Sequence, residues 1–286
     1  MVVGHIFSLA HYLFQRVDAA GDFGVFDQRR RVFAGTGGAV LYRRRALEEA
    51  GPLDEDFFLY MPHAMPHVPL FVSDKFKGHS KRGLYGDVIE EIDWSTGQVL
   101  DRLDSLGIAD NTLVIFSSDN GPAARGGGMT GGLRGHKATT YEGGIRVPLI
   151  ARWSGRIAAG TESDHISAFW DFLPTFATLG GAKPPENTDG LCMVPTLLNI
   201  PNKQKEHEFL YWEFHERGSK QAVRMGPWKG VRQNMLRRNN PDPRKIELYN
   251  LVEDIGETTD VAEAHPNILA EIHAIMEREH RPSELF

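Results

Sequence analysis

Two consecutive segments in the middle of the chain, a long amphipathic helix and an apolar strand, indicate an open α/β sheet. Residues 112–116 form an uninterrupted β-branched and apolar run, which is typical of a strand buried on both faces. In such sheets ligands gather where the strands end, here at 117–122. The preceding helix is predicted over 81–106, because its apolar residues recur at helical spacing: Leu84, Val88, Ile89, Ile92, Val99, Leu103 and Leu106.

The remaining pattern divides the chain into three segments. Before residue 60, a Gly-rich turn and strand over 32–42 precede a predicted helix over 43–50. The middle segment begins with a short strand over 57–61 and continues, after the strand above, with a strand over 147–153 and a helix over 167–179. From 201 the pattern changes to short strands and a closing amphipathic helix, which predicts a small α+β subdomain: 209–214, 221–232, 246–251 and 266–279.

Composition excludes several classes of protein. The 286 residues carry a net charge of −6 and 41% hydrophobic residues, values of a globular chain that does not bind nucleic acid. The single cysteine, Cys192, rules out an internal disulfide framework. No run is long enough for a membrane span, and Val2–Phe14 lacks the basic start of a signal peptide. The compartment and the oligomeric state are not indicated.

Two histidines lie in a proline-rich stretch directly after the first short strand of the middle segment. His63 and His67 are four residues apart, but Pro62, Pro66 and Pro69 exclude a helix, so we expect an extended loop. A histidine in a loop is commonly only solvated. The rigid proline frame makes a binding site equally plausible.

An acidic residue and an amide follow the apolar strand. Asp119 and Asn120 offer oxygen ligands of the kind that Ca²⁺ or Mg²⁺ prefers. The same residues, followed by Gly121 and Pro122, are also common in turns. Composition alone leaves both interpretations open.

A third cluster concentrates cations beside glycines. Arg134, His136, Lys137 and Arg146 accompany glycines that let the backbone approach an anion. The alternative is a surface loop in which Glu142 and Arg146 form a structural ion pair. Together, a hard-cation pair with lysine and histidine donors describes a site for a sulfate or phosphate ester.

Six strings from about residue 57 onward form an ordered set: FFLYMPHAMPHVPL, LVIFSSDNGP, GLRGHKATTYEGGIRVPLIARW, DFLPTFATLGG, VRMGPWKGV and ELYNLVEDIGETTDVAE. In their order and spacing they resemble the arylsulfatase A-like sulfatases of the alkaline phosphatase superfamily. The resemblance covers about 230 residues. It implies a partial alkaline-phosphatase-like α/β fold, a mixed sheet flanked by helices, with the small C-terminal α+β subdomain.

The resemblance assigns roles position by position. Asp119 and Asn120 are implied ligands of the divalent cation, usually calcium, with magnesium as an alternative. Lys137 would contact the sulfate and the leaving-group oxygen, and His67 would contact the sulfate and act as the acid. Arg134 and His136 are further candidates for substrate binding, and His63 is a candidate site residue without an assigned role. Glu142 and Arg146 are expected to be structural.

The chain also departs from the family pattern. The family attacks the ester with a formylglycine made within C/S-x-P/A-x-R, and this motif does not occur. Cys192 is followed by Met-Val-Pro-Thr near the end of the main domain, so we do not expect it to be the nucleophile. The family's N-terminal aspartate pair and its Gly-Lys-Trp-His stretch are missing as well.

Residues 33–60 resemble the acceptor-side end of a family 2 glycosyltransferase instead. The string FAGTGGAVLYRRRALEEAGPLDEDFFLY carries this resemblance, and FFLY suits both families. We therefore predict a chimeric chain: a glycosyltransferase-like fragment over 1–60, half of a sulfatase main domain over 61–200, and the sulfatase C-terminal subdomain over 201–286.

The leading hypothesis is a sulfatase acting on aryl or carbohydrate sulfate monoesters, expected to be inactive in this chain because the nucleophile motif is missing. One alternative is a phosphoester hydrolase or phosphotransferase of the same superfamily, since phosphate and sulfate present similar oxygens. Another is a non-catalytic anion- or glycan-binding remnant. Proteins of this family are commonly periplasmic, extracellular or lysosomal.

Overall fold

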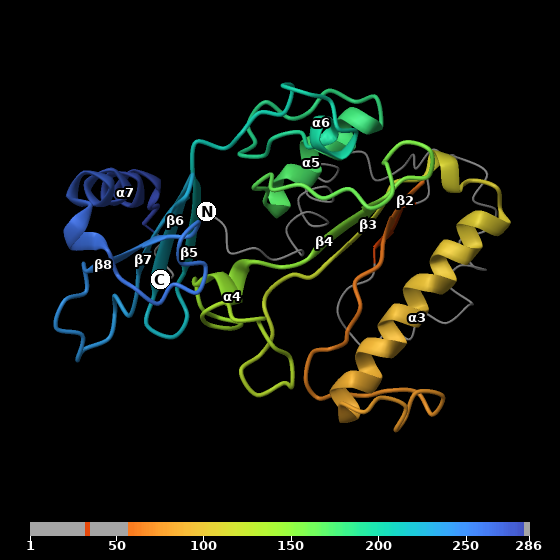
Figure 1. Ribbon diagram of the computed structural model, residues 1–286, viewed down its shortest axis with the longest axis horizontal. Helices are drawn as coiled ribbons and strands as arrows, with labels where there is room; N and C mark the ends of the chain where they lie inside the picture. Colours follow the sequence, from red (N-terminus) through yellow and green to blue (C-terminus); the bar gives the residue numbers. More distant parts are fainter. Residues whose placement is uncertain (1–31, 35–56, 283–286) are drawn as a thin grey trace, which may run out of the picture. The chain divides into compact units, whose positions relative to one another are not determined.

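The computed structural model describes residues 32–34 and 57–282, which group into two compact units (Figure 1). The larger unit comprises residues 116–150 and 162–282, and the smaller unit comprises 32–34, 57–115 and 151–161. Each unit is described by itself. The predicted helix over 43–50 and most of the segment likened to a glycosyltransferase lie outside the described residues.

The smaller unit is built around the long helix α3, Gly83–Ser105, which confirms the helix predicted over 81–106. Val88 and Leu103 are buried, but Leu84 and Ile89 are more than 40% exposed. The prediction that the whole apolar side packs on a sheet is therefore wrong for these two residues. Preceding α3 in the chain, β1 (Val32–Ala34) pairs in parallel with β2 (Phe58–Tyr60), and the short 3₁₀ turn η1 (Ala109–Asn111) follows it.

The strands β3 (Val114–Ser117) and β4 (Leu149–Arg152) pair with each other, and the chain passes between the two units within them. Both strands were predicted. However, every residue of β3 is only half-buried, and Ile150 of β4 is 61% exposed. The expectation that this strand is buried on both faces is wrong, because within the described residues β3 pairs only with β4.

The core of the larger unit is an antiparallel sheet in the order β5-β6-β7-β8. The predicted strand over 221–232 is a hairpin of two strands. The bounds are β5 Leu210–Phe214, β6 Lys220–Met225, β7 Trp228–Arg232 and β8 Ile246–Asn250. The predicted closing helix is α7, Pro266–Glu279, with η3 (Ala262–Ala264) before it.

The two faces of this sheet have different partners. On one face Val223 and Leu248 pack with Ile272 and Met276 of α7, which lies beside the sheet in Figure 1. Gly230 is required there, because a Cβ atom at this position would lie 2.4 Å from the side chain of Ile272. The register places Arg224, Lys229 and Tyr249 side by side in the row that faces the other way.

The helical segments that lie between β4 and β5 in the sequence complete the larger unit. The helix predicted over 167–179 is the turn η2 (Phe169–Asp171) followed by α5 (Phe172–Leu179), and the short α6 (Val194–Leu197) comes next. The buried carboxylate of Asp171 accepts the backbone N–H groups of Ala168 and Leu191 and pairs with His207 at 2.9 Å.

Candidate functional site

The residues that follow β3 form a turn rather than a continuation of the strand. Asp119 is exposed and Asn120 is half-buried. The hydroxyl of Ser118 donates to the backbone carbonyl of Asn120 at 3.1 Å, which stabilises the turn. Within the described part of the chain, no side chain pairs with the Asp119 carboxylate, so its oxygens remain available to a ligand.

Backbone hydrogen bonds hold this turn against the Gly-rich loop that carries Lys137. The N–H of Lys137 donates to the carbonyl of Pro122 at 2.9 Å, and the N–H of Gly121 donates to the carbonyl of Gly144 at 2.9 Å. Gly121 permits this approach, because a Cβ atom there would lie 1.9 Å from the carbonyl oxygen of Gly143. The backbone segments of the second and third clusters predicted from the sequence therefore lie side by side.

Lys137 is the cation of this loop that is left without a partner. Its side chain is half-buried, and no described residue pairs with its ammonium group. The next residue, Ala138, adopts φ +71°, a conformation that is costly for a residue with a Cβ atom and persists where the surroundings enforce it. A half-buried lysine without a carboxylate partner is suited to bind an anion.

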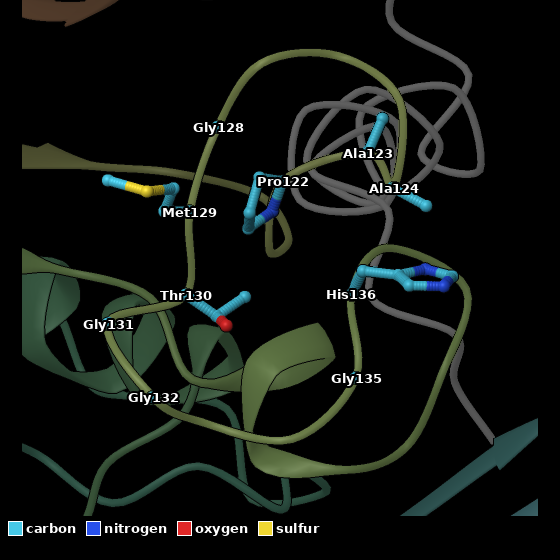
Figure 2. A pocket seen from close by; sticks show the side chains of 10 residues that line it. All are labelled: Pro122, Ala123, Ala124, Gly128, Met129, Thr130, Gly131, Gly132, Gly135 and His136. Carbon is cyan, nitrogen blue, oxygen red and sulfur yellow. The ribbon is translucent and has the colours of Figure 1, made fainter.

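His136 lines a cavity beside Lys137. Its Nδ1 lies 2.8 Å from the carbonyl oxygen of Lys137, which can only accept, so Nδ1 carries a proton and Nε2 is left for a ligand. Figure 2 shows His136 and Met129 on opposite sides of this cavity. The cavity has a volume of about 390 Å³ and is lined by Pro122, Ala123, Ala124, Gly128, Met129, Thr130, Gly131, Gly132, Gly135 and His136.

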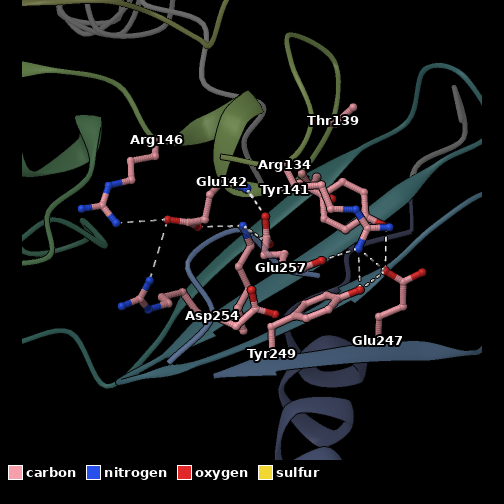
Figure 3. A network of polar contacts seen from close by, with 12 residues as sticks. Arg134, Thr139, Tyr141, Glu142, Arg146, Glu247, Tyr249, Asp254 and Glu257 are labelled. Atoms are coloured by element: carbon pink, nitrogen blue, oxygen red, sulfur yellow. Dashed lines mark hydrogen bonds and ion pairs between the residues drawn. The ribbon is translucent and has the colours of Figure 1, made fainter. Parts of the chain in front are cut away.

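Arg134 faces the C-terminal sheet and takes part in a polar network (Figure 3). Its guanidinium group donates to the hydroxyl of Tyr249 at 2.7 Å and to the carbonyl of Glu257 at 2.8 Å, and it stacks on the ring of Tyr141. Tyr141 and Tyr249 both donate to Glu247 at 2.6 Å. Burial and the hydrogen bond to Glu247 raise the pKa of both phenols, so both remain donors.

A buried lysine anchors the other end of the same loop. Lys229 of β7 is fully buried and contacts Glu142 at 2.7 Å and Glu257 at 3.1 Å. Glu257 in turn accepts the backbone N–H of Glu142, the first residue of α4 (Glu142–Ile145). The predicted ion pair between Glu142 and Arg146 is present, at 3.6 Å.

Sequence patterns did not single out Lys229, Glu257, Glu247 or Tyr249. A signal for Lys229 does exist, since it alternates with Val231 and so occupies an inward-facing position of its strand. Its carboxylate partners lie far away in the sequence, which is why the pairing could not be read from local spacing.

His67 and His63 belong to the smaller unit and are exposed in the predicted proline-rich loop. The Nδ1 of His67 donates to the carbonyl of Val68 at 2.8 Å, so its Nε2 is the nitrogen available to a ligand. The roles of both histidines remain predictions.

The donor chemistry of Asp119 and Asn120 fits a hard cation only in part. A carboxylate and an amide oxygen are suitable ligands, but Ca²⁺ takes six to eight oxygens. Among the described residues, no group of three or more His, Cys, Asp or Glu side chains is placed to hold a metal ion. These two residues can therefore supply part of a cation site but not a complete one.

Comparison with known families identifies the family of the chain. Residues 40–182, half of the chain, match the sulfatase family, and residues 135–281 match the C-terminal family of N-sulphoglucosamine sulphohydrolase. The chain belongs to the sulfatase family. The sulfatase match begins inside the segment likened to a glycosyltransferase, so residues 40–60 do not require a second family.

Individual sulfatases show the same relationship. Rat steryl-sulfatase is 42% identical over 59% of this chain and 32% of its own length. Rat N-acetylgalactosamine-6-sulfatase is 45% identical over 50% of this chain and 28% of its own length. Human arylsulfatase A is 39% identical over 64% of this chain and 37% of its own length. The matched region thus spans about a third of each of these relatives.

Solved structures show that the fold is a partial sulfatase fold of the alkaline-phosphatase-like α/β class. The structure of Ps i-CgsB with k-i-k-neocarrahexaose matches 82% of this chain with a TM-score of 0.71 and 30% identity, and 52% of its own chain is covered. The PsFucS1 sulfatase from Pseudoalteromonas sp. matches the same share of this chain with a TM-score of 0.68 and 26% identity, with 49% of its own chain covered. Within the described residues, no helix is both long and apolar enough to cross a membrane.

Proposed function

We propose that the larger unit forms part of a sulfatase site that binds the sulfate group of an aryl or carbohydrate sulfate monoester. The observation that carries this proposal is the pair of backbone hydrogen bonds that joins the Asp119–Pro122 turn to the Lys137 loop. They hold the backbone that carries Asp119 and Asn120 beside the backbone that carries Lys137, whose ammonium group pairs with no described residue. A cation and a lysine are the groups that bind and polarise a sulfate ester.

Each side chain has a defined task in this proposal. The Lys137 ammonium binds a sulfate oxygen and stabilises charge on the leaving oxygen. Asp119 and Asn120 hold calcium, or magnesium in its place, which when bound supplies Lewis-acid polarisation of the sulfate. His136 borders the substrate, whereas Arg134, whose guanidinium group donates to Tyr249 and Glu257, positions the loop. For His67, which belongs to the smaller unit, we keep the role of acid that the family resemblance implies.

The cavity beside His136 suits the alcohol part of the ester. Apart from Thr130 and His136, its lining residues are apolar or glycine, and its volume of about 390 Å³ is in the range of small-molecule sites. Thr130 and His136 supply the polar atoms that would orient a hydroxyl-bearing or aromatic group.

The nucleophile is not among these residues. The 286 residues contain no C/S-x-P/A-x-R motif, so we propose that they bind sulfate esters but do not hydrolyse them on their own. The division into segments 1–60, 61–200 and 201–286 is likewise a proposal, and a chimeric origin is proposed only for residues before 40, where the sulfatase match begins.

Ligand binding by the whole chain tests the function. We expect p-nitrophenyl sulfate to bind more tightly with calcium present, and Lys137→Ala to weaken binding about tenfold or more, the effect of losing a charge-assisted hydrogen bond. Lys203→Ala, which removes an exposed lysine elsewhere, is the matched control. Equal affinities for wild type and Lys137→Ala in calorimetry contradict the proposal, and tighter binding of p-nitrophenyl phosphate favours the phosphoester alternative.

A further inference from the structure

Two buried lysines on neighbouring strands of the C-terminal sheet differ in whether carboxylates surround them. Lys229 of β7 lies between the carboxylates of Glu142 and Glu257. Lys220, the first residue of β6, is only 5% exposed, yet no described carboxylate lies within ion-pair distance of it. Its ammonium group donates to the carbonyl of Glu216 at 2.7 Å and lies 4.7 Å from the ring of Phe214.

Two arginines add to the charge beside Lys220 rather than neutralise it. Arg237 packs over Gly218, since a Cβ atom on Gly218 would lie 2.8 Å from its Cγ and 3.1 Å from its Nε. The loop of Arg237 is fixed to the hairpin by hydrogen bonds from Met235 to Ser219 and from Leu236 to Gly218. Burial, followed by repulsion from Arg217 and Arg237, lowers the pKa of Lys220.

Burying a cation is costly unless an anion or hydrogen bonds compensate for the lost water. At Lys229 two carboxylates of the chain provide that compensation. At Lys220 the described residues provide one carbonyl, one ring and the more distant carboxylate of Glu216. Arg217 and Arg237 are exposed, and no described carboxylate lies within ion-pair distance of either guanidinium group. These two guanidinium forks match the oxygens of a sulfate group.

The loop that bears Arg237 also touches the candidate site. It begins at Gln233, whose side-chain amide donates to the hydroxyl of Thr140 at 2.9 Å, and Thr140 lies three residues after Lys137. Asn240 closes the loop by donating to the carbonyls of Gln233 and Asn234. The loop of Arg237 is therefore directly hydrogen-bonded to the segment that follows Lys137.

We propose that Arg217, Lys220 and Arg237 form a second anion site, which takes a further sulfate group of a multiply sulfated oligosaccharide whose ester binds at Lys137. This inference rests on the proposed function, because it assigns that function a polyanionic glycan as its substrate class. A monosulfated monosaccharide would engage only the Lys137 site.

The test compares two ligands on the full chain by calorimetry. The probes are k-i-k-neocarrahexaose, a sulfated hexasaccharide, and galactose 4-sulfate, a monosulfated monosaccharide. We expect the double variant Arg217→Ala/Arg237→Ala to bind the hexasaccharide about tenfold or more weakly and to bind galactose 4-sulfate as the wild type does. Lys203→Ala/Lys205→Ala removes the same charge from exposed positions and is expected to change neither affinity.

Three results overturn the inference. The first is an unchanged hexasaccharide affinity in Arg217→Ala/Arg237→Ala, and the second is an equal loss of hexasaccharide affinity in the control Lys203→Ala/Lys205→Ala. The third is a wild-type protein that binds the hexasaccharide no more tightly than galactose 4-sulfate. Sodium sulfate separates a glycan site from a site for free anions. If sodium sulfate binds as tightly as the hexasaccharide and shows the same loss, the glycan assignment is wrong.

The variant Lys137→Ala separates this inference from the proposed function. If both hold, Lys137→Ala weakens both sugars, whereas the arginine variant weakens only the hexasaccharide. If Lys137→Ala changes neither affinity while the arginine variant still weakens the hexasaccharide, the proposed function fails and the second anion site remains. Lys220→Arg, which keeps the charge, is expected to preserve hexasaccharide binding.

Discussion

At the scale of single residues, a buried ion pair outside the candidate site holds the loop of that site in place. Lys229 holds Glu142 at the start of α4, and Glu257 holds the backbone of Glu142 from the other side. These contacts fix the end of the loop that carries Lys137 and Arg134. We infer that the C-terminal sheet positions the anion site.

Replacing Lys229 leaves two buried carboxylates without a cation. We expect Lys229→Met to lower the free energy of unfolding by about 3–5 kcal/mol, as is usual when one partner of a buried pair is removed. Urea unfolding followed by circular dichroism measures this. The triple variant with Glu142→Gln and Glu257→Gln is expected to recover part of the loss, and a single variant as stable as the wild type contradicts the role given to Lys229.

Local sequence pattern was sufficient for some of these residues and not for others. Asp119, Asn120 and Lys137 could be singled out because each lies in a short string with its own chemistry, and their roles stay predictions. The link between Glu142 and Lys229 spans 87 residues, and that between Glu142 and Glu257 spans 115. Such partners are brought together by the packing of the loop on the sheet. Local periodicity in the sequence carries no information on that packing.

At the scale of elements, periodicity predicted where helices and strands lie better than what covers them. The closing helix is predicted with its observed bounds, and α3 to within a few residues. The exposed Leu84 and Ile89 show the limit, because an apolar stripe shows which face can be buried but not how much of it is. Of the strand predicted over 32–42 and the helix predicted over 43–50, only the part that forms β1 lies within the described residues.

A carboxylate on α3 also stabilises the segment that leads into this helix. Asp87 accepts the backbone N–H groups of Gly78 and Ser80 at 2.8 and 2.6 Å, and these bonds lower its pKa. A lowered pKa in the folded state means that the stabilisation is present above the ordinary pKa and is lost as the pH falls through the folded value. We therefore expect Asp87→Asn to lower Tm at pH 7.

The difference in Tm between wild type and Asp87→Asn should shrink as the pH is lowered from 6 towards 3, because protonation removes the same charge from the wild type. Thermal unfolding at a series of pH values measures this. Asp93→Asn, which changes an exposed aspartate of the same helix without a described hydrogen-bond partner, serves as the control. A difference in Tm that stays constant over this range contradicts the account.

At the scale of the whole molecule, the chain belongs to the sulfatase family but lacks the motif that forms the family's nucleophile. It covers 52% of the Ps i-CgsB structure and about a third of its curated relatives. In the function we propose, the lysine and the cation ligands bind and polarise an ester, but neither forms the covalent bond to sulfur. Binding and turnover should therefore be separable in this protein.

We expect the purified chain to release p-nitrophenol from p-nitrophenyl sulfate no faster than buffer, even with calcium. A version extended at its N-terminus by a sulfatase segment that carries a matured C/S-x-P/A-x-R motif should gain turnover that depends on calcium, because nucleophile and polarising groups then act on the same ester. In that extended protein Lys137→Ala should lower kcat/KM by about a hundredfold or more, the size of effect seen when a transition-state donor is removed. Calcium-dependent turnover by the unextended chain, or an unaffected Lys137→Ala variant in the extended one, would contradict the separation of binding from chemistry.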